Sequence, residues 1–169
     1  MQMKHELAQK VVRGEKTETR RPVKEGEDLI ERNGLKTVLT KAGRIKWQVG
    51  REYTLCWGRG KPAYYLVNDT LIAPDKLMLE LGYDSDSWHI LKIRLLDIYC
   101  EDVREISHTS SIAEGFTNPL EFLGVWASFY DSEASYAFSK YTMYPYDYVN
   151  KRPTSLYLAY ALKFEKVMP

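Results

Sequence analysis

The chain has 169 residues, of which 44% are apolar, and its 24 Lys and Arg residues nearly balance 23 Asp and Glu residues. This length and composition predict one globular domain over residues 1–169, with a core that needs no disulfide. No apolar run is long enough to span a membrane, and the first residues lack the apolar region of a signal peptide. We therefore expect a cytoplasmic protein with no membrane partner, in which Cys56 and Cys100 are free thiols.

The net charge of +1 hides an asymmetry along the chain. Residues 1–61 hold 15 basic and 8 acidic side chains, a balance of +7, whereas residues 62–169 hold 9 and 15, a balance of −6. A basic half indicates an anionic partner such as RNA or a nucleotide. A fold that brings the two halves together and cancels the field is the alternative.

The first predicted element is a helix over residues 3–13, because Met3, Leu7 and Val11 recur at helical spacing and Gly14 is a natural stop. The segment Lys16-Thr17-Glu18-Thr19-Arg20-Arg21 follows. If it is extended, Lys16, Glu18 and Arg20 share one face and Thr17, Thr19 and Arg21 share the other. Its chemistry suits a phosphate cradle, an activated nucleophile or a solvated surface.

Residues 23–43 are polar and contain an Asn33-Gly34 pair, and we expect a loop with a turn of helix near 28–32. Alternation in 53–57 predicts a strand, and 63–67 predict a second strand that forms a hairpin with it. The intervening turn, 58–62, would place Arg59 and Lys61 at an exposed tip, where cations and backbone amides can approach a phosphate.

No metal or cofactor is expected. A short helix is predicted over 74–81, followed by a loop at 82–87 whose alternating Asp and Ser resemble a calcium loop but lack its Gly and distal Glu. His5, His89 and His108 are scattered without the spacing of metal ligands.

A long strand is predicted over 88–100. Leu91, Ile93 and Leu95 share one face, and the phase then slips so that Leu96 and Ile98 continue inward. Such a slip predicts a bulge or a sharp bend of the kind that small barrels require.

Two helices follow. Ser107 can cap a short helix that reaches Ala113. A second helix begins at Asn118-Pro119-Leu120-Glu121, which combines a capping residue, a proline at the first position and a glutamate at the third. Its apolar face is expected to comprise Phe122, Leu123, Trp126, Phe129 and Tyr130.

Residues 131–154 hold Tyr136, Tyr141, Tyr144, Tyr146 and Tyr148. They suit a base-stacking surface or, as we favour, an irregular lid packed through aromatic rings. Alternation over 156–164 predicts a closing strand. The sum of these elements indicates an α+β fold, a small mixed β-barrel with flanking helices.

The assembled motifs resemble the ASCH family of the PUA-like superfamily. The family's Gly-x-Lys-Thr-x-Thr-x-Arg motif matches residues 14–21, and its Lys-Trp-x-x-Gly and Gly-Arg-Gly-Lys-Pro motifs match 46–50 and 58–62. Ile-Ser at 106–107, Ala-Glu-Gly-Phe at 113–116 and Glu-Phe-Leu-x-x-Trp at 121–126 follow in family order. Segments 23–44, 68–87 and 131–150 lie outside the match and resemble elaborations.

The resemblance implies a five- or six-stranded PUA-like barrel with a cleft lined by the Lys-Thr motif and by Glu114. ASCH proteins were proposed as RNA-binding modules, some small members are amidohydrolases acting on acetylated cytidine, and at least one is described as a ribonuclease. The lysine, threonine and glutamate of the amidohydrolases correspond to Lys16, Thr19 and Glu114 here.

Three functions remain after the sequence has been considered, one of which is a protein-interaction role. The first is binding of RNA or a nucleotide in the cleft, with Thr17, Arg20, Arg21, Arg59 and Lys61 as ligand contacts. The second is hydrolysis of an N4-acetylcytidine-like amide, in which Lys16 takes the proton of Thr19 and Glu114 protonates the leaving amine. Glu18 opposes the second, because a carboxylate beside Lys16 favours the protonated ammonium.

Overall fold

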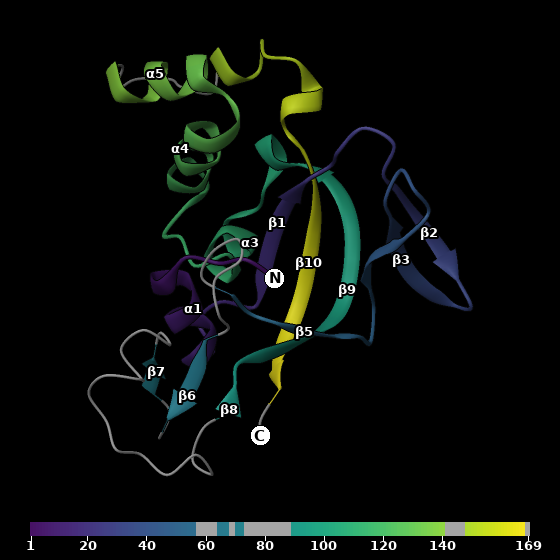
Figure 1. Ribbon diagram of the computed structural model, residues 1–169. Helices are drawn as coiled ribbons and strands as arrows, with labels where there is room; N and C mark the ends of the chain where they lie inside the picture. Colours follow the sequence, from purple (N-terminus) through teal and green to yellow (C-terminus); the bar gives the residue numbers. More distant parts are fainter. Residues whose placement is uncertain (57–63, 68–69, 73–88, 141–147, 168–169) are drawn as a thin grey trace.

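An antiparallel sheet of four strands forms the centre of the structure, in the order β1-β10-β9-β5 (Figure 1). The strands are β1 (Glu18–Pro22), β10 (Leu158–Val167), β9 (Lys92–Asp102) and β5 (Glu52–Thr54). The computed structural model describes residues 1–56, 64–67, 70–72, 89–140 and 148–167. The predicted strand 53–57 and closing strand 156–164 thus correspond in part to β5 and largely to β10.

The longest pairing, between β9 and β10, contains the predicted bulge. Phe164 pairs with Leu95 and Lys163 pairs with Asp97, so Leu96 is the extra residue. The slip is therefore confirmed, but the inward orientation expected for Leu96 is wrong, because its side chain is 51% exposed. The bulge absorbs Leu96 and returns Ile98 to the buried face.

A second antiparallel sheet consists of β2 (Asp28–Arg32), β3 (Leu35–Leu39) and β4 (Ile45–Gln48). The predicted loop with a helical turn near 28–32 is therefore wrong. Asn33 and Gly34 both have positive φ, 53° and 74°, which is the geometry of a two-residue hairpin turn. The charged, exposed residues of β2 concealed the strand, although the Asn-Gly pair is a hairpin signal.

A third small sheet has the order β7-β6-β8, formed by β6 (Tyr65–Val67), β7 (Thr70–Ile72) and β8 (His89–Ile90). The expected hairpin between 53–57 and 63–67 is not among the described strand pairings, because β5 pairs with β9 and β6 pairs with β7 and β8. One backbone hydrogen bond, from the N–H of Tyr64 to the carbonyl of Leu55, joins the two segments. The predicted turn 58–62 with Arg59 and Lys61, the helix 74–81 and the loop 82–87 lie outside the described residues.

Three predicted helices are confirmed: α1 (His5–Val12), α3 (His108–Ala113) and α4 (Pro119–Tyr130). The Ser107 and Asn118 side chains cap α3 and α4 by accepting hydrogen bonds from the backbone N–H groups of Ser110 and Glu121. Of the apolar face predicted for α4, Phe129 and Tyr130 are exposed rather than buried. The last turn of α4 therefore extends beyond the core.

The segment expected to be an irregular lid begins with a regular helix, α5 (Ser132–Lys140). Asp131 starts this helix, since its Oδ1 accepts the backbone N–H of Ala134. Two short 3₁₀ turns, η2 (Val103–Glu105) and η3 (Thr154–Leu156), flank β9 and β10. Tyr141, Tyr144 and Tyr146 lie outside the described residues.

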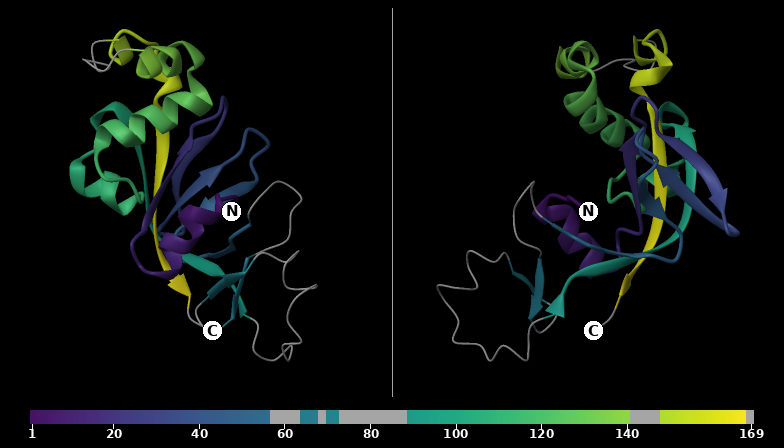
Figure 2. Two further views of the ribbon diagram at one scale, coloured as in Figure 1. Left: turned by 90° about the vertical axis from the view of Figure 1, so that its left-hand side faces the viewer. Right: turned by 45° about the vertical axis from the view of Figure 1, so that its right-hand side comes forward.

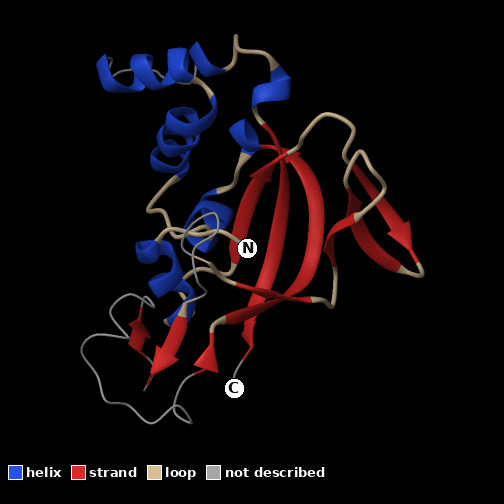
Figure 3. Cartoon of the chain, in the orientation of Figure 1, coloured by secondary structure: helices blue, strands red, loops and turns tan. Residues whose placement is uncertain are grey.

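The buried apolar side chains form two clusters. One joins α1 to the inner face of the four-stranded sheet, and the other packs α4 and α5 against η2, η3 and the start of β10. Figures 2 and 3 show α4 and α5 gathered at one end of the sheet and the β2–β3 hairpin on the opposite side.

The α+β class is confirmed, and the described strands form three antiparallel sheets. Within these ranges the four-stranded sheet is open, with β1 and β5 at its edges, so the structure does not show the closed barrel expected from the sequence. None of the described helices is both long and apolar enough to cross a membrane.

Candidate functional site

The site is built on the segment that links α1 to β1. Gly14, at a φ of 74°, ends α1, and the backbone N–H of Lys16 donates to the carbonyl of Lys10. The chain then enters β1, where Glu18 and Arg20 contact each other and Thr19 and Arg21 contact each other. The predicted alternation of faces therefore holds within the strand.

Lys16 is the most deeply buried charge of the motif, with 1% of the residue exposed. Its ammonium donates to the carbonyl oxygens of Glu18 at 2.7 Å and Glu114 at 2.6 Å, and to Glu114 Oε2. An ammonium has three protons, so these contacts use every donor. Lys16 and Glu114 are thus brought together, as the sequence predicted.

The guanidinium of Arg20 likewise donates hydrogen bonds from each of its nitrogens to acceptors in the protein. Its Nε donates to Glu101 Oε1 at 2.6 Å, its Nη1 to Glu18 Oε2 at 2.6 Å and its Nη2 to the Tyr99 hydroxyl at 3.2 Å. The side chain is fully buried. Each of its nitrogens already has a partner in the protein, so phosphate contact by Arg20 would require these bonds to break.

Glu114 reaches the site because α3 ends there. Gly115 follows at a φ of 91°, and a Cβ at this position would lie 3.0 Å from Cδ of Lys10. The positive φ is therefore the main reason for a glycine here, and the close approach of the Lys10 side chain adds to it. The tight turn places the Glu114 carboxylate against Lys16.

One oxygen of that carboxylate lacks a hydrogen-bond donor. Glu114 Oε1 is buried and accepts no hydrogen bond, although Arg20 Nη1 lies 3.7 Å away. A buried carboxylate oxygen without a donor is uncommon and indicates a missing partner, such as a water molecule or a ligand. Sequence motifs identified Glu114 but gave no sign that one of its oxygens is buried without a donor.

Lys16 and Arg20 lie with the carboxylates of Glu18, Glu101 and Glu114, and the Lys163 ammonium lies 3.7 Å from Glu18 Oε1. Burial lowers the pKa of Lys16, an effect that the Glu114 carboxylate opposes. Burial also acts to lower the pKa of Arg20, but Glu114 and Glu101 raise it above its usual range. Lys16 and Arg20 are therefore both paired with carboxylates of the cluster.

Arg21 differs from both. Its Nη1 donates to Thr19 Oγ1 at 3.0 Å and to the Arg20 carbonyl at 2.9 Å, and its Nη2 donates to the Gln2 carbonyl at 2.6 Å. All three acceptors are neutral, and within the described ranges no carboxylate forms a salt bridge with Arg21. Burial lowers its pKa, whereas the nearby Glu114 and Tyr130 act to raise it. Arg21 is thus the arginine of this motif that has no carboxylate partner among the described residues.

The two threonines lie in different settings. Thr19 is buried, and its hydroxyl accepts from Arg21. The hydrogen bonds of Lys16 therefore join it to Glu114 and not to Thr19. Thr17 is exposed, and its backbone links the carbonyl of Ala113 to the backbone N–H of Phe164.

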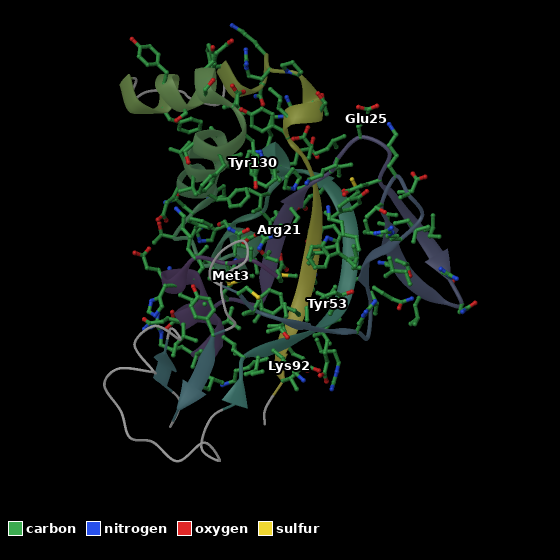
Figure 4. The ribbon with its side chains drawn as sticks, in the orientation of Figure 1. Met3, Arg21, Glu25, Tyr53, Lys92 and Tyr130 are labelled. Carbon is green, nitrogen blue, oxygen red and sulfur yellow. The ribbon has the colours of Figure 1, made fainter. Side chains whose placement is uncertain are left out.

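An aromatic surface that the sequence did not predict borders Arg21. The Tyr130 residue at the end of α4 is 41% exposed, its ring packs 4.6 Å from that of Trp126, and its hydroxyl lies in electrostatic range of Arg21. Phe129 is 57% exposed, with the Lys4 ammonium 4.7 Å from its ring centroid. Figure 4 shows Arg21 on β1 and Tyr130 above it. We call Lys4, Arg21, Phe129 and Tyr130 the cationic-aromatic patch.

A second buried ion network lies at the junction of α4 and α5. Asp131 Oδ2 accepts from Tyr157 at 3.0 Å and from Arg152 Nε at 2.9 Å. Its Oδ1 accepts from Arg152 Nη2 and from the backbone N–H of Ala134, both at 3.1 Å. The guanidinium of Arg104 lies 5.2 Å from the Tyr157 ring centroid. This network fastens the helices to the end of the central sheet.

The described residues also form a surface depression outside the Lys16 cluster. An open depression of about 520 Å³ lies between α4 and α5, lined by Leu120, Val125 and Phe138 among others, away from the Lys16 cluster. Among the residues that the structure describes, no group of three or more His, Cys, Asp and Glu could hold a metal ion.

Comparisons with known proteins give one structural similarity. No family model and no curated protein matches the chain. The chain is similar to the crystal structure of protein EF3133 from Enterococcus faecalis V583, which carries the family-model description DUF984. The two share 18% sequence identity over 96% of this chain and 70% of that chain, with a TM-score of 0.44. A likeness at this level carries no conclusion about activity.

Proposed function

We propose that the protein, as an ASCH-type PUA-like protein, binds RNA or a nucleotide at the junction of β1, α3 and the end of α4. Glu114 Oε1 carries the proposal, because it is a buried acceptor without a donor, and the Glu114 carboxylate lies in electrostatic range of Arg21, a member of the cationic-aromatic patch. An amino or imino group of a nucleobase supplies the missing donor. The ligand is therefore held by its base as well as by its phosphates.

The surrounding groups suit the remaining parts of such a ligand. Tyr130 and Phe129 present exposed rings on which a base can stack, a contact that contributes about 1–3 kcal/mol in single-stranded complexes. Arg21 and Lys4 provide positive charge for a phosphate. Lys16 and Arg20 hold Glu114 and Glu18 in place rather than contacting the ligand, which revises the contacts inferred from the sequence.

Fluorescence anisotropy with labelled single-stranded RNA, at several salt concentrations, tests the proposal. Each phosphate contact contributes a slope of about −0.7 to the dependence of log affinity on log salt concentration. Arg21→Gln is expected to weaken binding and to reduce the slope by about one contact.

Arg51→Gln is the matched control, since it removes the same charge from an exposed arginine beside Tyr53 on β5. Binding that is equally affected by both substitutions would exclude Arg21 as a specific contact. The absence of binding to any RNA pool or nucleotide at low salt would overturn the proposal.

A second function, amide hydrolysis of an acylated nucleoside, is favoured by one observation: burial lowers the pKa of Lys16 beside Glu114. In this reaction a proton first passes from the Lys16 ammonium to Glu114 Oε2 along their hydrogen bond. The Thr19 oxygen then attacks the acyl carbon, the neutral Lys16 amine accepts the Thr19 proton, and the protonated Glu114 gives its proton to the departing amine. Water then releases the acid from Thr19. The Thr19 hydroxyl would first have to exchange Arg21 for Lys16.

Acetate release from N4-acetylcytidine, measured with purified protein, tests hydrolysis separately from binding. Hydrolysis requires that Lys16→Met and Thr19→Val each abolish the release of acetate. A wild-type protein that binds nucleosides but leaves a broad panel of acylated nucleosides intact would exclude hydrolysis and retain the binding function.

A further inference from the structure

Strand β2 forms the outer edge of the sheet β2-β3-β4. Within the described part of the chain, β2 pairs with β3 alone. Figures 1 and 2 place it on the side of the molecule away from α4 and α5. Such an edge presents backbone N–H and C=O groups that can pair with another strand.

The hairpin turn determines which residues direct these groups outward. Arg32 and Leu35 flank the two-residue turn at Asn33-Gly34, so they form a hydrogen-bonded pair. Pairing then alternates along the strand, and Ile30 and Asp28 also direct their backbone groups toward β3. Leu29 and Glu31 are left with outward-facing N–H and C=O groups.

The sequence of this edge is complementary to itself. We propose that two copies of the protein associate through antiparallel pairing of β2 with β2, about a two-fold axis at Ile30. In this register Leu29 pairs with Glu31 of the second copy, and the two symmetric pairs form four backbone hydrogen bonds. Asp28 then faces Arg32 of the second copy on each side of the axis.

The side chains of β2 favour this partner. Asp28, Ile30 and Arg32 share one face of the strand, and all three are exposed. Ile30, 37% exposed, would contact Ile30 of the second copy, where directly opposed side chains approach closely. Within the described ranges, neither Asp28 nor Arg32 forms a salt bridge, so both charges are free to pair across the axis.

Charge also selects the register. Centring the axis on Glu31 places two glutamates directly opposite each other, and centring it on Leu29 places Glu27 opposite Glu31. Like charges in these positions are destabilising. The Ile30-centred register is the one in which each charged residue at positions 28 and 32 faces its opposite.

Sedimentation equilibrium of the full chain over a wide concentration range tests the proposal. A pair of five-residue strands is a small interface, so the expected dimer is weak and its population rises with concentration. Asp28→Arg would place arginine opposite arginine twice and is expected to raise the dissociation constant about tenfold. The double variant Asp28→Arg with Arg32→Asp restores the opposite charges and is expected to return the constant to within about threefold of the wild-type value.

Glu105→Arg provides the matched control, because it makes the same charge change at an exposed position in η2. Thermal unfolding of each variant establishes that the fold is intact. A wild-type protein that stays monomeric throughout the concentration range would overturn the proposal. Association that Asp28→Arg leaves unchanged, or that the double variant fails to restore, would place the interface elsewhere and also contradict it.

Discussion

The two buried ion networks of this protein differ in how completely their carboxylates are bonded. At the α4–α5 junction both oxygens of Asp131 accept two hydrogen bonds each, from Arg152, Tyr157 and Ala134. In the Lys16 network Glu114 Oε2 accepts from Lys16, whereas Oε1 has no donor. We call the Asp131 network closed, because both carboxylate oxygens have donors, and the Lys16 network open, because Glu114 Oε1 has none.

This difference is the basis on which we assign a structural role to Asp131 and propose a binding role for Glu114. A buried carboxylate with all its donors in the protein has nothing left to offer a ligand, so Asp131 stabilises the fold. The unpaired oxygen of Glu114 costs free energy in the absence of a ligand. In the proposed complex, a donor group on the ligand would supply the hydrogen bond that this oxygen lacks.

The largest effect is expected when the closed network is broken. Asp131→Ala should lower the free energy of unfolding by about 3–5 kcal/mol, because it leaves the buried Tyr157 hydroxyl without its acceptor and removes the buried partner of Arg152. Denaturant unfolding followed by circular dichroism measures the loss. Glu133→Ala is the control, since it removes a mostly exposed carboxylate from the same arginine and should cost under about 1 kcal/mol.

The open network should respond differently to the loss of its cation. Lys16→Met leaves the Glu114 carboxylate buried without its partner and is expected to cost about 3 kcal/mol in unfolding free energy. Adding Glu114→Leu removes the stranded charge and should recover part of that loss. A double variant no more stable than Lys16→Met would show that the two residues are not energetically coupled.

A substitution in the cationic-aromatic patch is expected to weaken RNA binding while changing stability little. Tyr130→Ala should weaken RNA binding by about 1–3 kcal/mol through lost stacking. The half-exposed ring contributes less to stability, so the unfolding free energy should change by under about 1 kcal/mol. Tyr136→Ala is the control, an exposed tyrosine on α5 outside the patch. Equal loss of affinity in both variants would contradict a role specific to Tyr130.

The smallest expected effect is a difference in acid sensitivity. Burial acts to raise the pKa of Asp131, but its hydrogen bonds from Arg152, Ala134 and Tyr157 hold it below the ordinary value of 3.8. The unfolded chain therefore binds this proton more readily. The contribution of Asp131 to stability is present above pH 3.8 and is lost as the pH falls through the lowered folded pKa.

Asp131→Asn should remove this component of the acid dependence. Unfolding free energies of the wild type and the variant, measured between pH 5 and pH 3, should converge as the pH falls. A constant difference between them over this range would show that Asp131 does not titrate as the structure indicates.

Local signals in the sequence determined several elements. The Ser107 and Asn118 caps, the apolar spacing of α1 and the phase slip at Leu96 each depend on residues within a turn or two of one another. The sequence-based predictions were wrong for elements whose burial does not follow the usual pattern of apolar residues. β2 carries mostly exposed charged residues and lacks the alternation of a half-buried strand, and the tyrosine-rich appearance of 131–154 concealed α5.

The site itself depended on contacts between distant segments. Motif resemblance singled out Lys16 and Glu114, but their contact joins residues 98 positions apart, and the Arg20 contact with Glu101 spans 81. No local pattern reveals that Lys16 and Arg20 are saturated, that Arg21 has only neutral acceptors or that Tyr130 is exposed. The sequence determined which charged groups are present. The tertiary structure decided which of them neutralise one another, because hydrogen-bond partners and burial depend on how the elements pack.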